Sequence, residues 1–150
     1  MSVTEQFLKL HERLYEATDG RVGHKMIGVP TLLLRTTGRK SGQTRTNALV
    51  YASDGGDYLV VASNGGADKP PAWLFNLEAK PEVEIQIGRK RQAGSARALR
   101  PDDPDYERVW KIVNENNKDR YTAYQKQTER PIPVVAVTPG AAAPAASSAG

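Results

Sequence analysis

The chain has 150 residues, of which 39% are hydrophobic and 25% charged, with a formal net charge of +4 and no cysteine. These values predict one soluble globular domain and exclude a bilayer-spanning apolar run, a disulfide, a thiolate nucleophile and an iron–sulfur cluster. The first residues form no signal sequence, so we expect a cytoplasmic protein. Redox chemistry would therefore need a bound cofactor.

The chain begins with a pattern typical of an amphipathic helix. Ser2 and Glu5 have capping-box spacing, and apolar residues then recur at helical intervals until residues 19–20, Asp-Gly, supply a stop. The polar face mixes both charges, which favours a packed surface helix over one that lies on a membrane. Peripheral association with the inner face of the cell membrane stays open as an alternative.

Two hairpins are predicted next. Residues 31–37 and 46–52 read as strands on either side of a glycine-containing turn, because both are rich in apolar and β-branched residues. Residues 53–57 are a second strong turn signal, and residues 58–62 follow as a buried type of strand. Residues 63–71 then form a long loop whose glycines expose backbone donors.

The second half of the chain continues this mixed pattern. We expect a short helix around Trp73 that ends before Pro81, strands at 83–87 and 91–99, a helix from Tyr106 to Val113, a helical turn at 121–124 and a strand at 131–138. About six strands joined by tight turns predict an α+β fold around an antiparallel sheet or small barrel. Residues 1–139 form the predicted domain, and residues 140–150 a disordered Ala/Pro/Ser tail.

The turn at residues 38–45, Gly-Arg-Lys-Ser-Gly-Gln-Thr-Arg, is a candidate anion-binding turn. Gly38 and Gly42 can take positive φ, and the cations and hydroxyls between them can bond to phosphate or carboxylate oxygens. With Arg35 the stretch carries four cations and no acid, which favours an acidic small molecule or polyanion as ligand. A strand follows the turn, so it is not a Walker P-loop. A solvated hairpin tip explains the same residues equally well.

Other chemistry is disfavoured. His11 and His24 are the only histidines, and neither stands in a metal-ligand pattern, so we expect no metal site. No serine is flanked by nucleophile-elbow glycines, so a hydrolase triad has no support.

Three blocks together, at residues 38–45, 61–81 and 121–133, resemble the deazaflavin-dependent nitroreductase family of actinobacteria. The second block begins Val-Ala-Ser-Asn-Gly-Gly, and the third ends Arg-Pro-Ile-Pro. The resemblance covers about residues 8–139 and implies an FMN-binding-like split β-barrel. It also implies the cofactor F-420, an 8-hydroxy-5-deazaflavin with a phosphate and a polyglutamate tail. The chain departs from the family at residues 47–49, where many members have a proline, and this affects strand geometry more than chemistry.

The resemblance also implies roles for particular residues. The phosphate would be held by Lys40 and Arg45, with Arg39 and Ser41 nearby. Backbone donors along the deazaflavin ring would come from Ala62, Ser63, Asn64, Gly65 and Gly66. The pocket would be walled by Trp73 and Asn76, although Trp73 suits a plain core position nearly as well. The candidates for a catalytic hydrogen-bond donor to the electron acceptor are Ser63, Tyr121 and Tyr124.

The function implied is that of an F-420-dependent reductase, of nitroreductase or quinone reductase type. It would transfer a hydride from the reduced deazaflavin to an electrophilic acceptor such as a quinone, an activated alkene or a nitroaromatic or nitroimidazole compound. One alternative is an FMN-binding oxidoreductase on the same barrel. Another is a non-enzymatic module that binds polyanions, but we expect no nucleic-acid partner because basic residues elsewhere are interleaved with acids. The physiological acceptor and the oligomeric state stay open.

Overall fold

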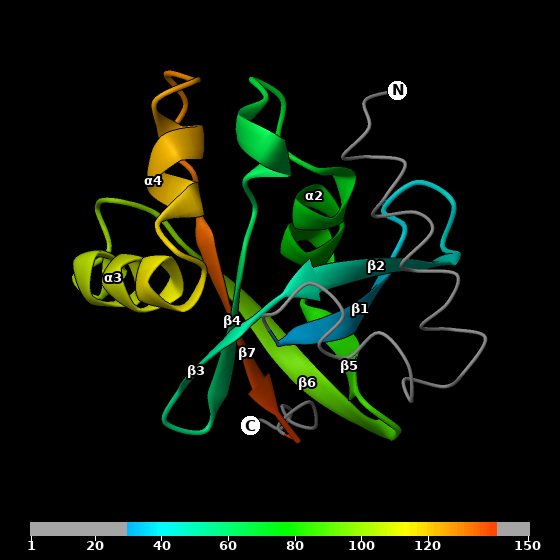
Figure 1. The fold of residues 1–150 in the computed structure, drawn as a ribbon. Helices are drawn as coiled ribbons and strands as arrows, with labels where there is room; N and C mark the ends of the chain where they lie inside the picture. The colour runs from blue at the N-terminus through cyan, green and yellow to red at the C-terminus, as the bar shows by residue number, and fades with distance from the viewer. Residues whose placement is uncertain (1–29, 141–150) are drawn as a thin grey trace.

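A computed structural model describes residues 30–140, so the predicted first helix and the Ala/Pro/Ser tail from residue 141 lie outside the described residues. Figure 1 shows a strongly curled sheet with helices packed against it. The sheet has seven strands in the order β2-β1-β5-β6-β7-β4-β3, and every pairing is antiparallel. The predicted α+β fold around a curled antiparallel sheet is confirmed.

The elements follow the sequence pattern closely. The strands are β1 (Thr31–Thr37), β2 (Thr44–Val50), β3 (Ala52–Asp54), β4 (Asp57–Val61), β5 (Glu82–Ile87), β6 (Lys90–Leu99) and β7 (Val134–Pro139). The helices are the single 3-10 turn η1 (Asn64–Gly66), α2 (Ala72–Ala79), α3 (Tyr106–Asn116) and α4 (Arg120–Gln125). No helix within residues 30–140 is long and apolar enough to cross a membrane.

The one strand predicted at residues 46–52 is wrong, because the structure divides it at Tyr51 into β2 and β3. The Tyr51 N–H donates to the Pro30 carbonyl oxygen at 3.1 Å. Since β2 and β3 are the two edge strands of the sheet, this single residue carries the chain from one edge to the other. The sheet therefore curls on itself, and its strand count rises from about six to seven.

The core lies on both faces of the sheet. On β4 the Val60 side chain packs toward β1 and α2, whereas Leu59 and Val61 pack toward α3 and α4. The same alternation holds on β7, where Val135 and Val134 belong to the two different core clusters. Because both faces of these strands are covered, their sequences are almost continuously apolar.

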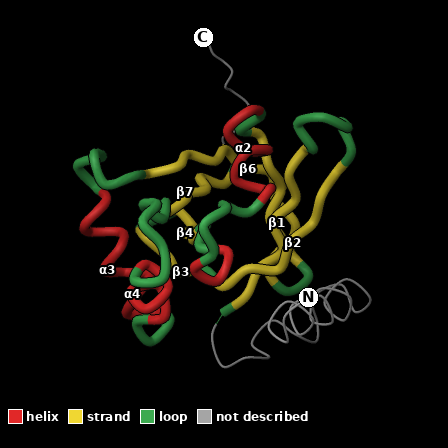
Figure 2. The backbone as a smooth tube through the Cα atoms, turned by 90° about the horizontal axis from the view of Figure 1, so that it is seen from above, coloured by secondary structure: helices red, strands yellow, loops and turns green. Residues whose placement is uncertain are grey.

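One end of the barrel carries the loops that matter for function. Figure 1 shows η1 between α4 and α2, and the tip of the β1–β2 hairpin on the far side of α2. The view from above in Figure 2 agrees that η1 lies beside α4. The fold thus brings residues 62–67 and 120–130 into contact although they are distant in sequence, and it places the turn at residues 38–43 on the other side of α2.

Candidate functional site

The turn between β1 and β2 is closed by its own hydrogen bonds. Gly38 N–H donates to Gln43 O at 2.7 Å, and Gly42 N–H donates to Gly38 O at 2.8 Å. Gln43 N–H donates to Ser41 Oγ at 3.1 Å, so the Ser41 hydroxyl stabilises the turn. The amides of Gly38 and Gly42 are therefore occupied and cannot donate to a ligand.

The predicted positive φ is right for Gly42, whose φ is 72°, and wrong for Gly38, whose φ is not positive. Gly38 is needed for space, because a Cβ atom there would lie 2.6 Å from Ser41 Oγ. A glycine-rich turn is thus required on physical grounds, but its two glycines serve different purposes.

The cations of the turn project from this closed backbone. Lys40 and Arg45 are exposed, and neither forms an ion pair with any residue in the 30–140 range. The Arg39 guanidinium lies 5.0 Å from the centroid of the Phe75 ring, a cation–π distance. The charges of Lys40 and Arg45 are therefore uncompensated by the described protein and available to an anion.

Arg35 does not belong to this group of cations. Its guanidinium pairs with Glu84 at 3.3 Å and donates to Gln86 Oε1 at 2.9 Å, because β1 and β5 pair in a register that places Arg35 opposite Glu84. The prediction of four cations without an acid is wrong on this point. Gln86 is fully buried although it lies between the apolar residues Ile85 and Ile87 of β5, and it accepts from Arg35 there.

A shallow depression of about 430 Å³ lies against the turn. It is lined by residues 37–42 together with Ala79 and Lys80. Sequence reasoning missed Lys80, and the indirect signal is that this residue caps the C-terminus of α2, which contacts β1 of the hairpin. The depression therefore combines three flexible cationic side chains, those of Arg39, Lys40 and Lys80, with the backbone of the turn.

Asn76 joins α2 to the turn. Its Oδ1 accepts from the Arg39 N–H at 3.1 Å, and its Nδ2 donates to Thr36 Oγ1 at 3.3 Å. The side chain is buried, and both ends of its amide are used within the protein. The structure thus gives Asn76 a bracing role beside the predicted pocket.

The loop after β4 carries unpaired backbone donors. Ala62 N–H donates to Pro133 O at 3.0 Å, and Gly66 N–H donates to Ser63 O at 2.9 Å. The three amides between them, those of Ser63, Asn64 and Gly65, have no partner among residues 30–140. Asn64 has φ 47° and its Nδ2 donates to Lys69 O at 3.0 Å, which holds the loop in shape. Consecutive free amides of this kind suit acceptor atoms of a ligand.

Ser63 and the two tyrosines supply hydroxyl groups near this loop. Ser63 is 8% exposed, and its Oγ forms no hydrogen bond within residues 30–140. The Tyr121 and Tyr124 rings meet edge to face, with centroids 6.2 Å apart. Burial raises the pKa of Tyr121 to about 12, so its hydroxyl stays neutral near pH 7 and can donate a hydrogen bond. The partly buried Tyr124 is the more accessible of the pair.

Trp73 lies in the core. It is 4% exposed and packs in the cluster that contains Leu32, Val60 and Ile85. Of the two roles considered for Trp73, its surroundings in the structure match the core position.

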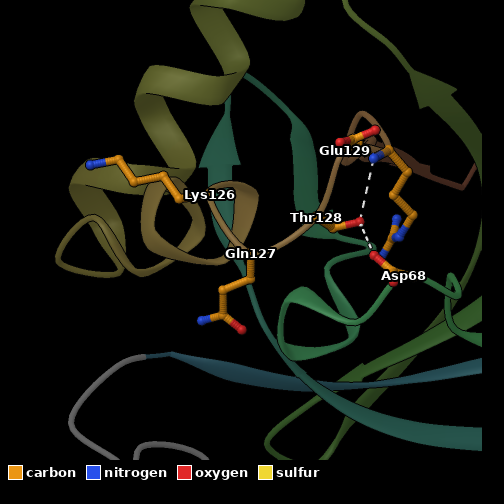
Figure 3. Close-up of a pocket in the computed structure, with 6 residues that line it drawn as sticks. Asp68, Lys126, Gln127, Thr128 and Glu129 are labelled. Carbon is orange, nitrogen blue, oxygen red and sulfur yellow. Dashed lines mark hydrogen bonds between the residues drawn. The ribbon is translucent and has the colours of Figure 1, made fainter.

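Arg130 is the residue near this loop to which sequence reasoning gave no role. It follows α4, and its guanidinium donates to the carbonyl oxygens of Ala62, Ser63 and Ala67. Figure 3 shows the neighbouring hollow, of about 630 Å³, where Thr128 points toward Asp68 and donates to its Oδ1 at 2.7 Å. Lys126 points away from this pair. Thr128 and Arg130 therefore bind the loop at residues 62–68 through Asp68 and through backbone carbonyl groups.

The donor set fits a cofactor that is anionic at one end and carries a polar ring at the other. The uncompensated cations lie at the hairpin tip, and the free amides lie on the other side of α2 (Figure 1). The curled antiparallel half-barrel is shared with deazaflavin-dependent reductases of known structure. An F-420H(2)-dependent reductase of known structure, FDR-A, is 40% identical with a TM-score of 0.65, over 72% of this chain and 93% of that one.

The family model described as F-420H(2)-dependent quinone reductase matches residues 7–139, and the chain belongs to this family. An F-420H(2)-dependent quinone reductase of Mycobacterium tuberculosis is 54% identical over 134 residues, which are 89% of this chain and 90% of that protein. A structure described as a domain-swapped dimer is 36% identical with a TM-score of 0.67, over 91% of this chain and 99% of that one. The predicted family and enzyme class are confirmed.

Proposed function

We propose that this chain binds reduced coenzyme F-420 and uses it to reduce a quinone, the activity by which its family and its mycobacterial relative are named. The observation that carries the proposal is the presence, at one end of the barrel, of an uncompensated cationic turn and a loop with three unpaired amides. A ligand with an anionic part and a separate polar ring needs both features, because cations bind the anionic part and backbone N–H groups bind the ring.

The cofactor would be held by residues at two places. Lys40 and Arg45 attract its phosphate, and Lys80 extends the positive potential along the depression beside α2. The amides of Ser63, Asn64 and Gly65 donate to acceptor atoms of the ring. When bound, the reduced deazaflavin supplies the hydride, and the protein supplies orientation and electrostatics.

The acceptor would lie near the hydroxyl groups of Ser63, Tyr121 and Tyr124. A quinone oxygen gains negative charge as the ring is reduced, and a neutral O–H aimed at it stabilises that charge. A tyrosine hydroxyl is protonated near pH 7 even at its ordinary pKa, and burial raises the pKa of Tyr121 further, so this residue would act as a donor and not as a base. Nitroaromatic compounds and activated alkenes also carry a polar group that such donors can bind.

We expect Lys40→Ala or Arg45→Ala to weaken binding of F-420 by roughly ten- to a hundredfold, or about 1–3 kcal/mol, as for loss of a charge-assisted contact. The measurement is a fluorescence titration with the oxidised cofactor. The matched control is Lys111→Ala, which removes the same charge from an exposed position on α3. Figure 1 shows α3 on the opposite side of the molecule from the hairpin tip.

The control variant should bind F-420 as the wild type does. The losses in the two turn variants should shrink as salt is added, since exposed charges are screened. Wild-type affinity in both Lys40→Ala and Arg45→Ala would contradict the assignment of the turn to the anionic part of the cofactor.

A further inference from the structure

The guanidinium of Arg130 donates to three carbonyl groups of the loop, two of them at short distance. Its Nε donates to Ala67 O at 2.8 Å, and its Nη2 donates to Ser63 O at 2.8 Å. The Ala62 carbonyl oxygen lies within 3.3 and 3.4 Å of the two terminal nitrogens. One planar cation thus binds carbonyl groups before, within and after the segment that carries the unpaired amides.

The planar peptide bond means that the directions of these carbonyl groups also fix the directions of the amide N–H groups. In a trans peptide unit the C=O of one residue and the N–H of the next point in opposite directions. The Ala62 carbonyl shares its unit with the Ser63 N–H, and the Ser63 carbonyl shares its unit with the Asn64 N–H. Because both carbonyls face Arg130, both free N–H groups point away from it.

The same contacts strengthen the two amides as donors. A carbonyl that accepts from a cation is polarised, and polarisation along a peptide unit makes its N–H a better donor. The positive charge behind the loop acts in the same direction. The guanidinium therefore affects both the aim and the strength of the Ser63 and Asn64 amides.

Arg130 is itself held by the segment that carries the tyrosines. Gln125, the last residue of α4, donates from Nε2 to Arg130 O at 2.8 Å and accepts at Oε1 from Ile132 N–H at 2.9 Å. The loop also touches this segment directly, since a Cβ atom at Gly66 would lie 2.9 Å from Tyr124 O. The backbone of Arg130, from which the guanidinium reaches the loop, is thus held against α4.

We propose that Arg130 is a positioning residue, whose contacts with the Ala62 and Ser63 carbonyls aim the Ser63 and Asn64 N–H groups at acceptor atoms of the bound deazaflavin. The inference rests on the proposed function. Arg130 would act on the cofactor indirectly, by holding the loop that binds it. Arg130 should therefore govern affinity for the cofactor even though its donors are directed at the protein.

The first experiment titrates oxidised F-420 into the wild type, Arg130→Ala, Arg130→Lys and Thr128→Ala. We expect Arg130→Ala to lose roughly tenfold or more in affinity. The affinity of Arg130→Lys should lie no higher than about halfway between those of Arg130→Ala and the wild type, because a single nitrogen cannot reach all three carbonyls. Thr128→Ala is the matched control, since it removes two bonds behind the same loop, to Asp68 Oδ1 and from the Arg130 backbone N–H, and keeps every donor of the Arg130 guanidinium.

Compared with sodium chloride at the same concentration, guanidinium chloride well below the concentrations that unfold small proteins should restore binding to Arg130→Ala, and Thr128→Ala should bind equally in both salts. A merely destabilised loop would be weakened further by this salt. Wild-type affinity in Arg130→Ala, an equal loss in Thr128→Ala, or no gain from guanidinium would each overturn the proposal.

A readout without cofactor separates this proposal from the function on which it rests. In amide NMR spectra of the ligand-free protein, the Ser63 and Asn64 signals should shift in Arg130→Ala and return toward their wild-type positions with guanidinium. Unchanged signals would overturn the positioning role whatever the cofactor does. A wild type that binds no F-420 while these signals respond would instead contradict the proposed function alone.

Discussion

Gly66→Ala is expected to lower the free energy of unfolding by about 2–4 kcal/mol and to abolish most binding of F-420. Gly66 has φ 87°, which an alanine adopts only with strain. A Cβ atom there would also lie 2.9 Å from both Tyr124 O and Gln127 Oε1. Gln127 can rotate away, but Tyr124 O is backbone, so the loop must move off α4 and its free amides must move with it.

The neighbouring glycine provides the control for this variant. Gly65 has φ 66°, and a Cβ atom added there would meet nothing within 4 Å. Gly65→Ala should therefore lose only about 1 kcal/mol, the conformational term. Urea unfolding and cofactor titration of the two variants together separate backbone strain from steric displacement. Equal losses in both would contradict the close packing of the loop against α4.

Trp73→Ala is expected to lower the free energy of unfolding by about 3–5 kcal/mol, the range for truncation of a buried aromatic side chain. Trp73 is 4% exposed and packs among residues of β1, β4 and β5. Phe75→Ala, on the same helix, should lose less than about 1 kcal/mol, because Phe75 is 39% exposed and its ring faces the Arg39 guanidinium.

Thermal and urea unfolding of the two helix variants decides between the two roles considered for Trp73. A core role predicts the large difference in stability just given. Wild-type stability in Trp73→Ala, accompanied by weaker binding of F-420, would instead establish Trp73 as a wall of the cofactor pocket.

The elements of the fold were predictable because turn residues and apolar periodicity are both local features of the sequence. Glycines marked the hairpins, and alternation or continuous apolar runs marked most strand ends within one or two residues, although β7 begins at Val134 and not at residue 131. The division at Tyr51 was not predictable, because residues 46–52 are uniformly suited to a strand. It depends on the Tyr51 bond to Pro30 and on closure of the sheet, which no local pattern shows.

The candidate site was predictable where a residue's own chemistry identified it. Lys40 and Arg45 project as unpaired cations, as their sequence context indicated. Arg35 was wrongly added to them because its partner Glu84 lies 49 residues away and meets it only through the β1–β5 register. Charge balance in a sheet is set by the neighbour across the strands, which the sequence alone does not identify.

Arg130 was missed for a related reason. Its three partners are backbone carbonyl groups more than sixty residues earlier in the chain, and a carbonyl leaves no mark in a sequence. An arginine before a Pro-Ile-Pro segment is unremarkable by composition. The only available signal was its place within the third block of the family resemblance.

The most direct test of the account is a fluorescence titration of the wild-type protein with oxidised F-420, with FMN and NADPH titrated in parallel. The account predicts saturable quenching in the micromolar range with F-420 alone. Binding of FMN alone would indicate a flavin-binding barrel, and absence of any binding would contradict the assignment of the turn and the loop to a deazaflavin.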